Sequence, residues 1–96
     1  MIRIFAFTHT KASYNTNLAK DYVLLLYTEK TEAVQDLKKY FTKTLEKTKL
    51  PQKTKDEIAE KFRTDLLQGR FCYHFRDTSD PEEPQYFGKI HTRYVE

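Results

Sequence analysis

The stretch TKDEIAEKFRTDLLQGRFCYHFR, residues 54–76, decides the fold class, because the spacing of its apolar residues changes within it. Ile58, Phe62 and Leu66 recur every four residues, which is typical of the buried side of a helix. After Gly69, aromatic residues recur at every second position, which indicates a half-buried strand. The glycine itself stands where helices commonly end. A helix that leads directly into such a strand favours the α+β class.

Residues 31–48 are also predicted to form a helix, because apolar residues recur there at helical spacing without Gly or Pro. These residues are Val34, Leu37, Phe41 and Leu45. Thr31, followed by an acidic residue, is typical of a helix N-cap region. Pro51 ends this helix, because the residue before a proline avoids helical geometry. Thr54 and Glu57 then match a capping box, so we expect the second helix to begin there.

Three further segments are predicted to be strands. Residues 2–8 (IRIFAFT) carry apolar side chains on both faces, which suggests an internal strand. The run YVLLLY, residues 22–27, fits a central strand or a buried helical turn, and its shortness favours the strand. Residues 86–95 alternate apolar and basic side chains, so they would form a hairpin with the strand after Gly69. Residues 9–18 are polar, contain Asn-Thr-Asn and are predicted to form a loop.

The sequence thus predicts one α+β domain over residues 1–96, in the order β-β-α-α-β-β, with a two-helix hairpin on one face of a mostly antiparallel sheet. A single cysteine, Cys72, excludes an intramolecular disulfide and favours a reducing compartment. The N-terminus lacks a signal-peptide pattern, and no apolar run approaches the roughly 20 residues of a membrane span. We therefore expect a cytoplasmic protein with no membrane partner.

Positive charge is concentrated in residues 38–55, which hold seven lysines and one glutamate, a net charge of +6. The whole chain carries +3, so the remaining residues sum to −3. The lysines are Lys38, Lys39, Lys43, Lys47, Lys49, Lys53 and Lys55. Three of them are spaced by four and form a row that the others extend, which suits contact with nucleic-acid phosphates. The plainer alternative is a solvated helix face whose lysines pair with acids of the next helix. Those acids are Asp56, Glu57, Glu60 and Asp65.

A second candidate surface is the basic face of the predicted hairpin. Its residues are His74, Arg76, Lys89, His91 and Arg93, and Phe87 can join them as a stacking surface. Sheet faces of this composition can bind single-stranded RNA, although no RNP-type motif is present. We expect His74 and His91 to lie opposite or diagonal to each other. An ordinary solvated sheet face is the plainer alternative.

Catalysis and metal binding are minor alternatives. His74 and His91 could act as acid and base in a metal-independent ribonuclease, but no activating carboxylate is evident beside them. Cys72 and the two histidines lack a recognised zinc spacing. Common nucleotide-binding and hydrolase motifs are absent, and the acidic segment 77–83 is typical of a hairpin loop. We therefore expect a non-enzymatic protein without a cofactor or metal.

The leading hypothesis is a small protein that binds RNA or another polyanion. The lysines would hold phosphates, while Arg76, Arg93 and Phe87 would contact bases or ribose. The alternative is an inhibitor, encoded by a virus or phage, that blocks a host enzyme, a ribonuclease toxin or a defence system by direct protein contact. An exposed sheet edge would serve such a contact, or a homodimer, by adding a strand to the partner's sheet.

Overall fold

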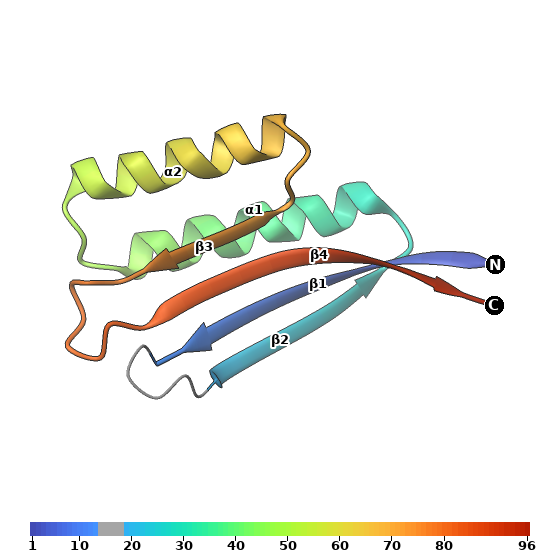
Figure 1. Cartoon of the computed structure of the whole chain (residues 1–96), viewed down its shortest axis with the longest axis horizontal. Helices are drawn as coiled ribbons and strands as arrows, with labels where there is room; N and C mark the ends of the chain where they lie inside the picture. The colour runs from blue at the N-terminus through green and yellow to red at the C-terminus, as the bar shows by residue number, and fades with distance from the viewer. Residues whose placement is uncertain (14–18) are drawn as a thin grey trace.

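The computed structural model of the chain describes residues 1–13 and 19–96. Their strands form one antiparallel sheet in the order β2-β1-β4-β3, and both helices lie on the same side of it (Figure 1). The elements are β1 (Ile2–Ala12), β2 (Ala19–Tyr27), α1 (Lys30–Lys47), α2 (Gln52–Leu67), β3 (Cys72–Arg76) and β4 (Gln85–Val95). The predicted fold class, element order and helical hairpin are confirmed.

β1 is an internal strand, as predicted, because it pairs with both β2 and β4. It is longer than expected, however, and residues 9–12 belong to it rather than to a loop. These residues alternate between the two faces of the sheet, and the ladder with β4 continues as far as Ala12 opposite Gln85. The ladder and the strand preference of threonine outweigh the polarity of the segment. The Asn-Thr-Asn stretch lies outside the described residues.

β2 is an edge strand, so the expectation of a central strand was wrong. β4 takes the place on the other side of β1, which leaves β2 with a single neighbour. Because side chains alternate along a strand, every second side chain of its apolar run faces away from the helices. Tyr22, Leu24 and Leu26 are 60%, 51% and 63% exposed, respectively, while Leu25 packs against the core.

Both helices begin earlier than their predicted caps. α1 starts at Lys30 after Glu29, so Thr31 lies inside its first turn rather than at the N-cap. α2 starts at Gln52, and Pro51 occupies the cap position, where its carbonyl accepts a hydrogen bond from the Lys55 N–H at 3.0 Å. Proline fits the start of a helix because its φ is fixed and it has no N–H to satisfy. The predicted capping box is therefore wrong.

The end of α2 follows the sequence closely. Gly69 adopts a positive φ of 79°, which glycine tolerates without a steric penalty. Its N–H donates to the Leu66 carbonyl at 3.0 Å, and the Arg70 N–H donates to the Asp65 carbonyl at 2.8 Å. These two bonds make a Schellman motif, which satisfies the last carbonyls of the helix and turns the chain toward β3.

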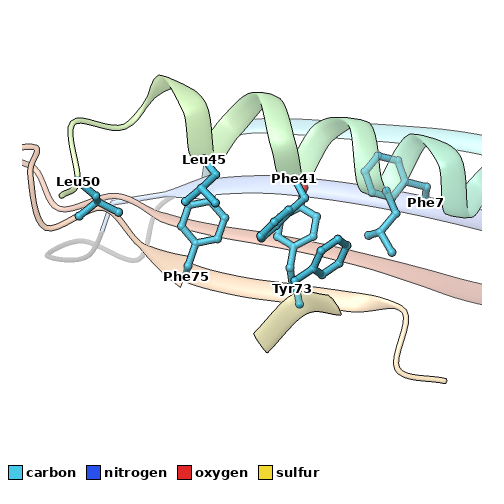
Figure 2. Packing of buried hydrophobic residues seen from close by; sticks show 8 residues of the cluster. Phe7, Phe41, Leu45, Leu50, Tyr73 and Phe75 are labelled. Carbon is cyan, nitrogen blue, oxygen red and sulfur yellow. The ribbon is translucent and has the colours of Figure 1, made fainter. Parts of the chain in front are cut away.

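The core lies between the helices and the inner face of the sheet, meaning the face that the helices cover (Figure 2). Phe41 of α1 is at its centre and stacks on Phe62 of α2, with ring centroids 4.0 Å apart. Its ring also meets the edges of Tyr73 and Phe75 on β3, at 5.3 and 5.7 Å. The two predicted helical stripes and the predicted aromatic strand thus pack against one another.

Tyr73 lies across Gly88 on the neighbouring strand β4. An ideal Cβ at Gly88 would meet three atoms of the Tyr73 ring within 2.7 Å, where ordinary contact begins at 3.4 Å. A hydrogen atom is therefore the only substituent that this position accepts while the ring remains in place. The ring in turn reaches across β4 to β1, where its hydroxyl meets His9.

Candidate nucleic-acid interface

The basic residues of the hairpin lie on the open face of the sheet, the one turned away from the helices. The β3–β4 register places His74 opposite Phe87 and Cys72 opposite Lys89. His91 and Arg93 continue along β4 on the same face. Tyr73, Phe75 and Tyr86 point the other way, into the core. The predicted division of the hairpin into an apolar face and a basic face is confirmed.

Phe87 and His74 form an aromatic pair on this open face. Their rings stack with centroids 4.3 Å apart and an interplanar angle of 11°. His74 Nε2 lies 2.8 Å from Gln85 Oε1, which fixes the imidazole over the phenyl ring. Phe87 is still 38% exposed, so the pair offers a flat aromatic surface to solvent.

The two histidines of the hairpin do not form the expected pair. His74 lies opposite Phe87, and His91 is four residues further along β4, a separation of about 13 Å at the usual rise of a strand. His91 Nε2 instead lies 3.5 Å from the hydroxyl of Thr8 on β1. The expectation that they lie opposite or diagonal was therefore wrong. No group of three His, Cys, Asp or Glu in the described ranges is arranged to hold a metal ion.

None of the four described strands places an acidic residue on the open face. Asp21 is the single acidic residue in the four strands, and it lies opposite Lys11 on the inner face. Burial, together with Lys89 and Arg93, lowers the pKa of His91, so this imidazole is neutral near pH 7. Charge on the open face therefore comes from Lys89, Arg93 and Arg76.

The same face has an apolar half, which the sequence reasoning missed. Tyr22, Leu24 and Leu26 of β2 are exposed beside β1, and Ile2 and Val95 are 59% and 46% exposed at the ends of β1 and β4. The signal was present in the composition of residues 22–27. It could be interpreted only after the register showed which of these side chains lie on the open face.

The lysines of residues 38–55 are on the other side of the sheet and do not form one extended row. Lys39, Lys43 and Lys47 line a hollow between α1 and the inner face of β1 and β2. Lys49 lies beside the acidic loop, where its N–H bonds the Ser79 hydroxyl at 3.1 Å, and Lys55 shares a hollow with Glu46 and Asp56. Lys38 and Lys53 are exposed. The sheet separates these lysines from the basic hairpin face.

The acids of α2 do not form the ion pairs with the lysines of α1 that the plainer alternative requires. Glu60 pairs with Arg63, and Asp65 pairs with Arg70 at 3.5 Å. Asp56 accepts a hydrogen bond from Gln52 at 2.9 Å. Within residues 1–13 and 19–96, no ion pair joins an acid of α2 to a lysine of α1.

A third histidine, His9, was overlooked at the sequence level. It is 6% exposed on β1, and its Nδ1 lies 2.5 Å from the Tyr73 hydroxyl. The rings of Tyr40 and Tyr86 lie 5.4 and 6.2 Å from the imidazole. Burial lowers the pKa of His9, and Asp21 partly opposes this shift. Its alternation with Phe5 and Phe7 was the available clue, because it placed His9 on their face.

Comparisons with known proteins do not identify a relative, since no family model, curated protein or solved structure matches the chain. Neither described helix is long and apolar enough to cross a membrane.

Proposed function

We propose that the protein binds single-stranded RNA on the open face of its sheet. The observation that carries the proposal is the stacked pair of His74 and Phe87, with Lys89 and Arg93 two and six residues further along β4, on strands without an acidic residue on that face. Antiparallel sheets that have helices on one side can use the other side to stack unpaired bases on aromatic rings.

The chemical roles divide between the aromatic and the charged residues. Phe87 lies on the central strand β4, where a base can stack beside it without meeting the helices. Lys89 and Arg93 follow it at spacings of two and six residues on the same face, so their charges lie along one line. Cations arranged along a line suit the phosphates of an extended strand, and the aromatic pair suits its bases.

The lysines of the helical side have no part in this interface. They were candidate phosphate ligands, but the sheet lies between them and Phe87. A short strand that lies on the open face does not reach Lys39 or Lys43. This separation makes the helical lysines useful as internal controls.

The test measures binding of a fluorescent 12-nucleotide single-stranded RNA by anisotropy at several salt concentrations. Phe87→Ala removes a stacking surface worth about 1–3 kcal/mol per base, so affinity should fall by about 5- to 150-fold. Lys89→Gln combined with Arg93→Gln should weaken binding and reduce the slope of log K against log salt by roughly 1.4, or about 0.7 per lost phosphate contact.

The matched control is Lys38→Gln combined with Lys53→Gln, which removes the same charge from exposed positions on the helices. It should change affinity less than twofold. If this control weakens binding as much as the β4 double variant does, net charge alone accounts for the affinity and the proposed interface is wrong. Absence of binding at low salt would dismiss RNA as the ligand.

A protein-inhibitor function is the second candidate, and the exposed apolar side chains of β2 favour it. Tyr22, Leu24 and Leu26 stand on an edge strand whose outer backbone groups have no strand partner among the described residues. Such edges accept a strand from another protein or from a second copy of the same chain. Leu24→Gln, which changes no charge, should abolish a protein partner that remains bound after nuclease treatment, and should leave RNA affinity within threefold. A partner captured equally well by the variant would argue against this use of β2.

A further inference from the structure

A groove runs along α1 on the inner side of the sheet, opposite the proposed RNA interface. Two hollows of about 230 and 170 Å³ form it. They adjoin, because both are lined by His9, Asp21, Thr44 and Lys47. α1 forms one wall, and the inner faces of β1 and β2 form the floor.

The groove is strongly positive. Lys39, Lys43 and Lys47 line it from α1, and Lys11 lines it from β1. Among the described residues of the lining Asp21 is the single acid, so these residues carry a net charge of +3. Among the described residues no ion pair involves these lysines, and Lys11 only lies over the Tyr86 ring, with its Nζ 5.9 Å from the centroid.

The convergence of these four lysines on the groove does not stabilise the fold. Like charges four residues apart on a helix destabilise it by a few tenths of a kilocalorie per pair. The row Lys39, Lys43 and Lys47 contains two such pairs, and Lys11 adds a fourth positive charge from another element. A solvated helix face would not require that these charges converge on a hollow. A bound anion would remove the repulsion between them.

Neutral polar groups lie beside the charges. The His9 imidazole lines both hollows, and its Nδ1 is engaged by Tyr73. Burial lowers the pKa of His9, so it does not add a further positive charge near pH 7. Thr44 lines both hollows from α1, and its hydroxyl is a hydrogen-bond donor. Tyr40 and Tyr86 add aromatic surface to the lining, and Val23 adds an apolar side chain from β2.

We propose that this groove binds a phosphomonoester group, held by the ammonium groups of Lys39, Lys43 and Lys47 with Lys11 at the adjoining hollow. A phosphomonoester carries close to two negative charges near pH 7, whereas each phosphate within a nucleic-acid strand carries one. The described lining carries +3, with Lys39, Lys43 and Lys47 exposed to solvent around the hollow, and therefore favours the monoester. The group can come from a free nucleotide or from the 5′ end of a nucleic acid. This site does not rest on the RNA interface, which lies across the sheet.

The experiment follows the His9 imidazole by NMR while inorganic phosphate is added at constant ionic strength. Saturable changes in the His9 signals and an upward shift of its pKa are expected, because an anion beside the ring stabilises its charged form. Lys39→Gln combined with Lys43→Gln should weaken phosphate binding at least tenfold. Lys38→Gln combined with Lys53→Gln, which removes equal charge outside the groove, should change it less than twofold.

Two further pairs of probes identify the source of the group. Adenosine 5′-monophosphate is compared with adenosine, and a 5′-phosphorylated oligoribonucleotide is compared with its 5′-hydroxyl form, in the Phe87→Ala variant to suppress the open face. Stronger binding of the phosphorylated member in either pair supports the site and names its source. Equal binding within both pairs, equal losses in the two lysine double variants, or no saturable response to phosphate would overturn it.

Discussion

Replacing Gly88 with alanine should destabilise the protein strongly. In most strands the same replacement stabilises the protein. Glycine inside a strand usually costs about 0.5–1 kcal/mol relative to alanine, because it loses more backbone freedom on folding. At Gly88 the new Cβ would lie within 2.7 Å of three Tyr73 ring atoms. The nearest of these atoms would lie at 2.1 Å, so the ring must retreat by about 1.3 Å before it reaches ordinary contact at 3.4 Å.

Tyr73 has little room to retreat. It is 6% exposed, and its ring meets those of Phe41 and Phe62 at centroid distances of 5.3 and 5.8 Å. Its hydroxyl holds His9 Nδ1 at 2.5 Å. Overpacking of a dense core costs about 1–3 kcal/mol, and loss of a buried hydrogen bond costs about 1–3 kcal/mol more. We expect a loss of about 3 kcal/mol, which lowers Tm by roughly 12–24 °C in a domain of this size.

Urea unfolding, followed by far-UV circular dichroism, measures this loss. The same Gly88→Ala change is then made in a Tyr73→Leu background, which lacks the ring atoms that clash. If the clash is the cause, the substitution there should cost less than about 1 kcal/mol, and the double-mutant cycle should give a coupling of about 2 kcal/mol. A loss below about 1 kcal/mol in the wild-type background, or equal losses in both backgrounds, would refute the reasoning.

Three further outcomes follow from the structure. Gly69→Ala should lower the free energy of unfolding by about 1–2 kcal/mol, because a residue with a Cβ is strained at a φ of 79°. Nothing lies within 4 Å of the new atom, so a clash adds nothing to this strain. A loss under about 0.5 kcal/mol in urea unfolding would contradict this. Phe62→Ala should cost about 3–5 kcal/mol by opening a cavity beside Phe41, and the urea midpoint should fall without a change in slope. The free energy of unfolding should fall as the pH is lowered below about 6.5. The reason is that the pKa of His9 is lowered in the folded state, so the unfolded state binds the proton more readily. This loss grows as pH falls from the unfolded pKa through the folded one, and His9→Gln should reduce it more than His91→Gln does.

Much of the fold was accessible from spacing alone. Phe41 and Phe62 appeared at helical positions, Tyr73 and Phe75 appeared at strand positions, and all four meet in the core. One error arose where two local helix-start signals competed. Pro51 displaced the capping box, because a proline can begin a helix as well as end one.

The candidate sites were less accessible, because they depend on which strands become neighbours. Sequence alternation correctly placed Lys89 and Arg93 on one face, but the register that separates His74 from His91 is set by the length of the connecting loop. The convergence of Lys11 with Lys47 on one hollow also depends on the fold, since β1 and α1 are distant in the sequence. His9 was readable as an inner-face residue, yet its tyrosine partner became visible only in the folded chain.

The pairing of Ile2 with Val95 has a mechanical consequence. β1 and β4 are antiparallel neighbours, so the two ends of the chain leave the domain side by side (Figure 1). A force that pulls these ends apart acts across the ladder and loads its hydrogen bonds one after another. Strands drawn past each other along their length would instead resist with many bonds at once. The β1–β4 ladder at the centre of the sheet therefore separates one hydrogen bond at a time when the two ends are pulled apart, although each of its strands has a neighbour on both sides.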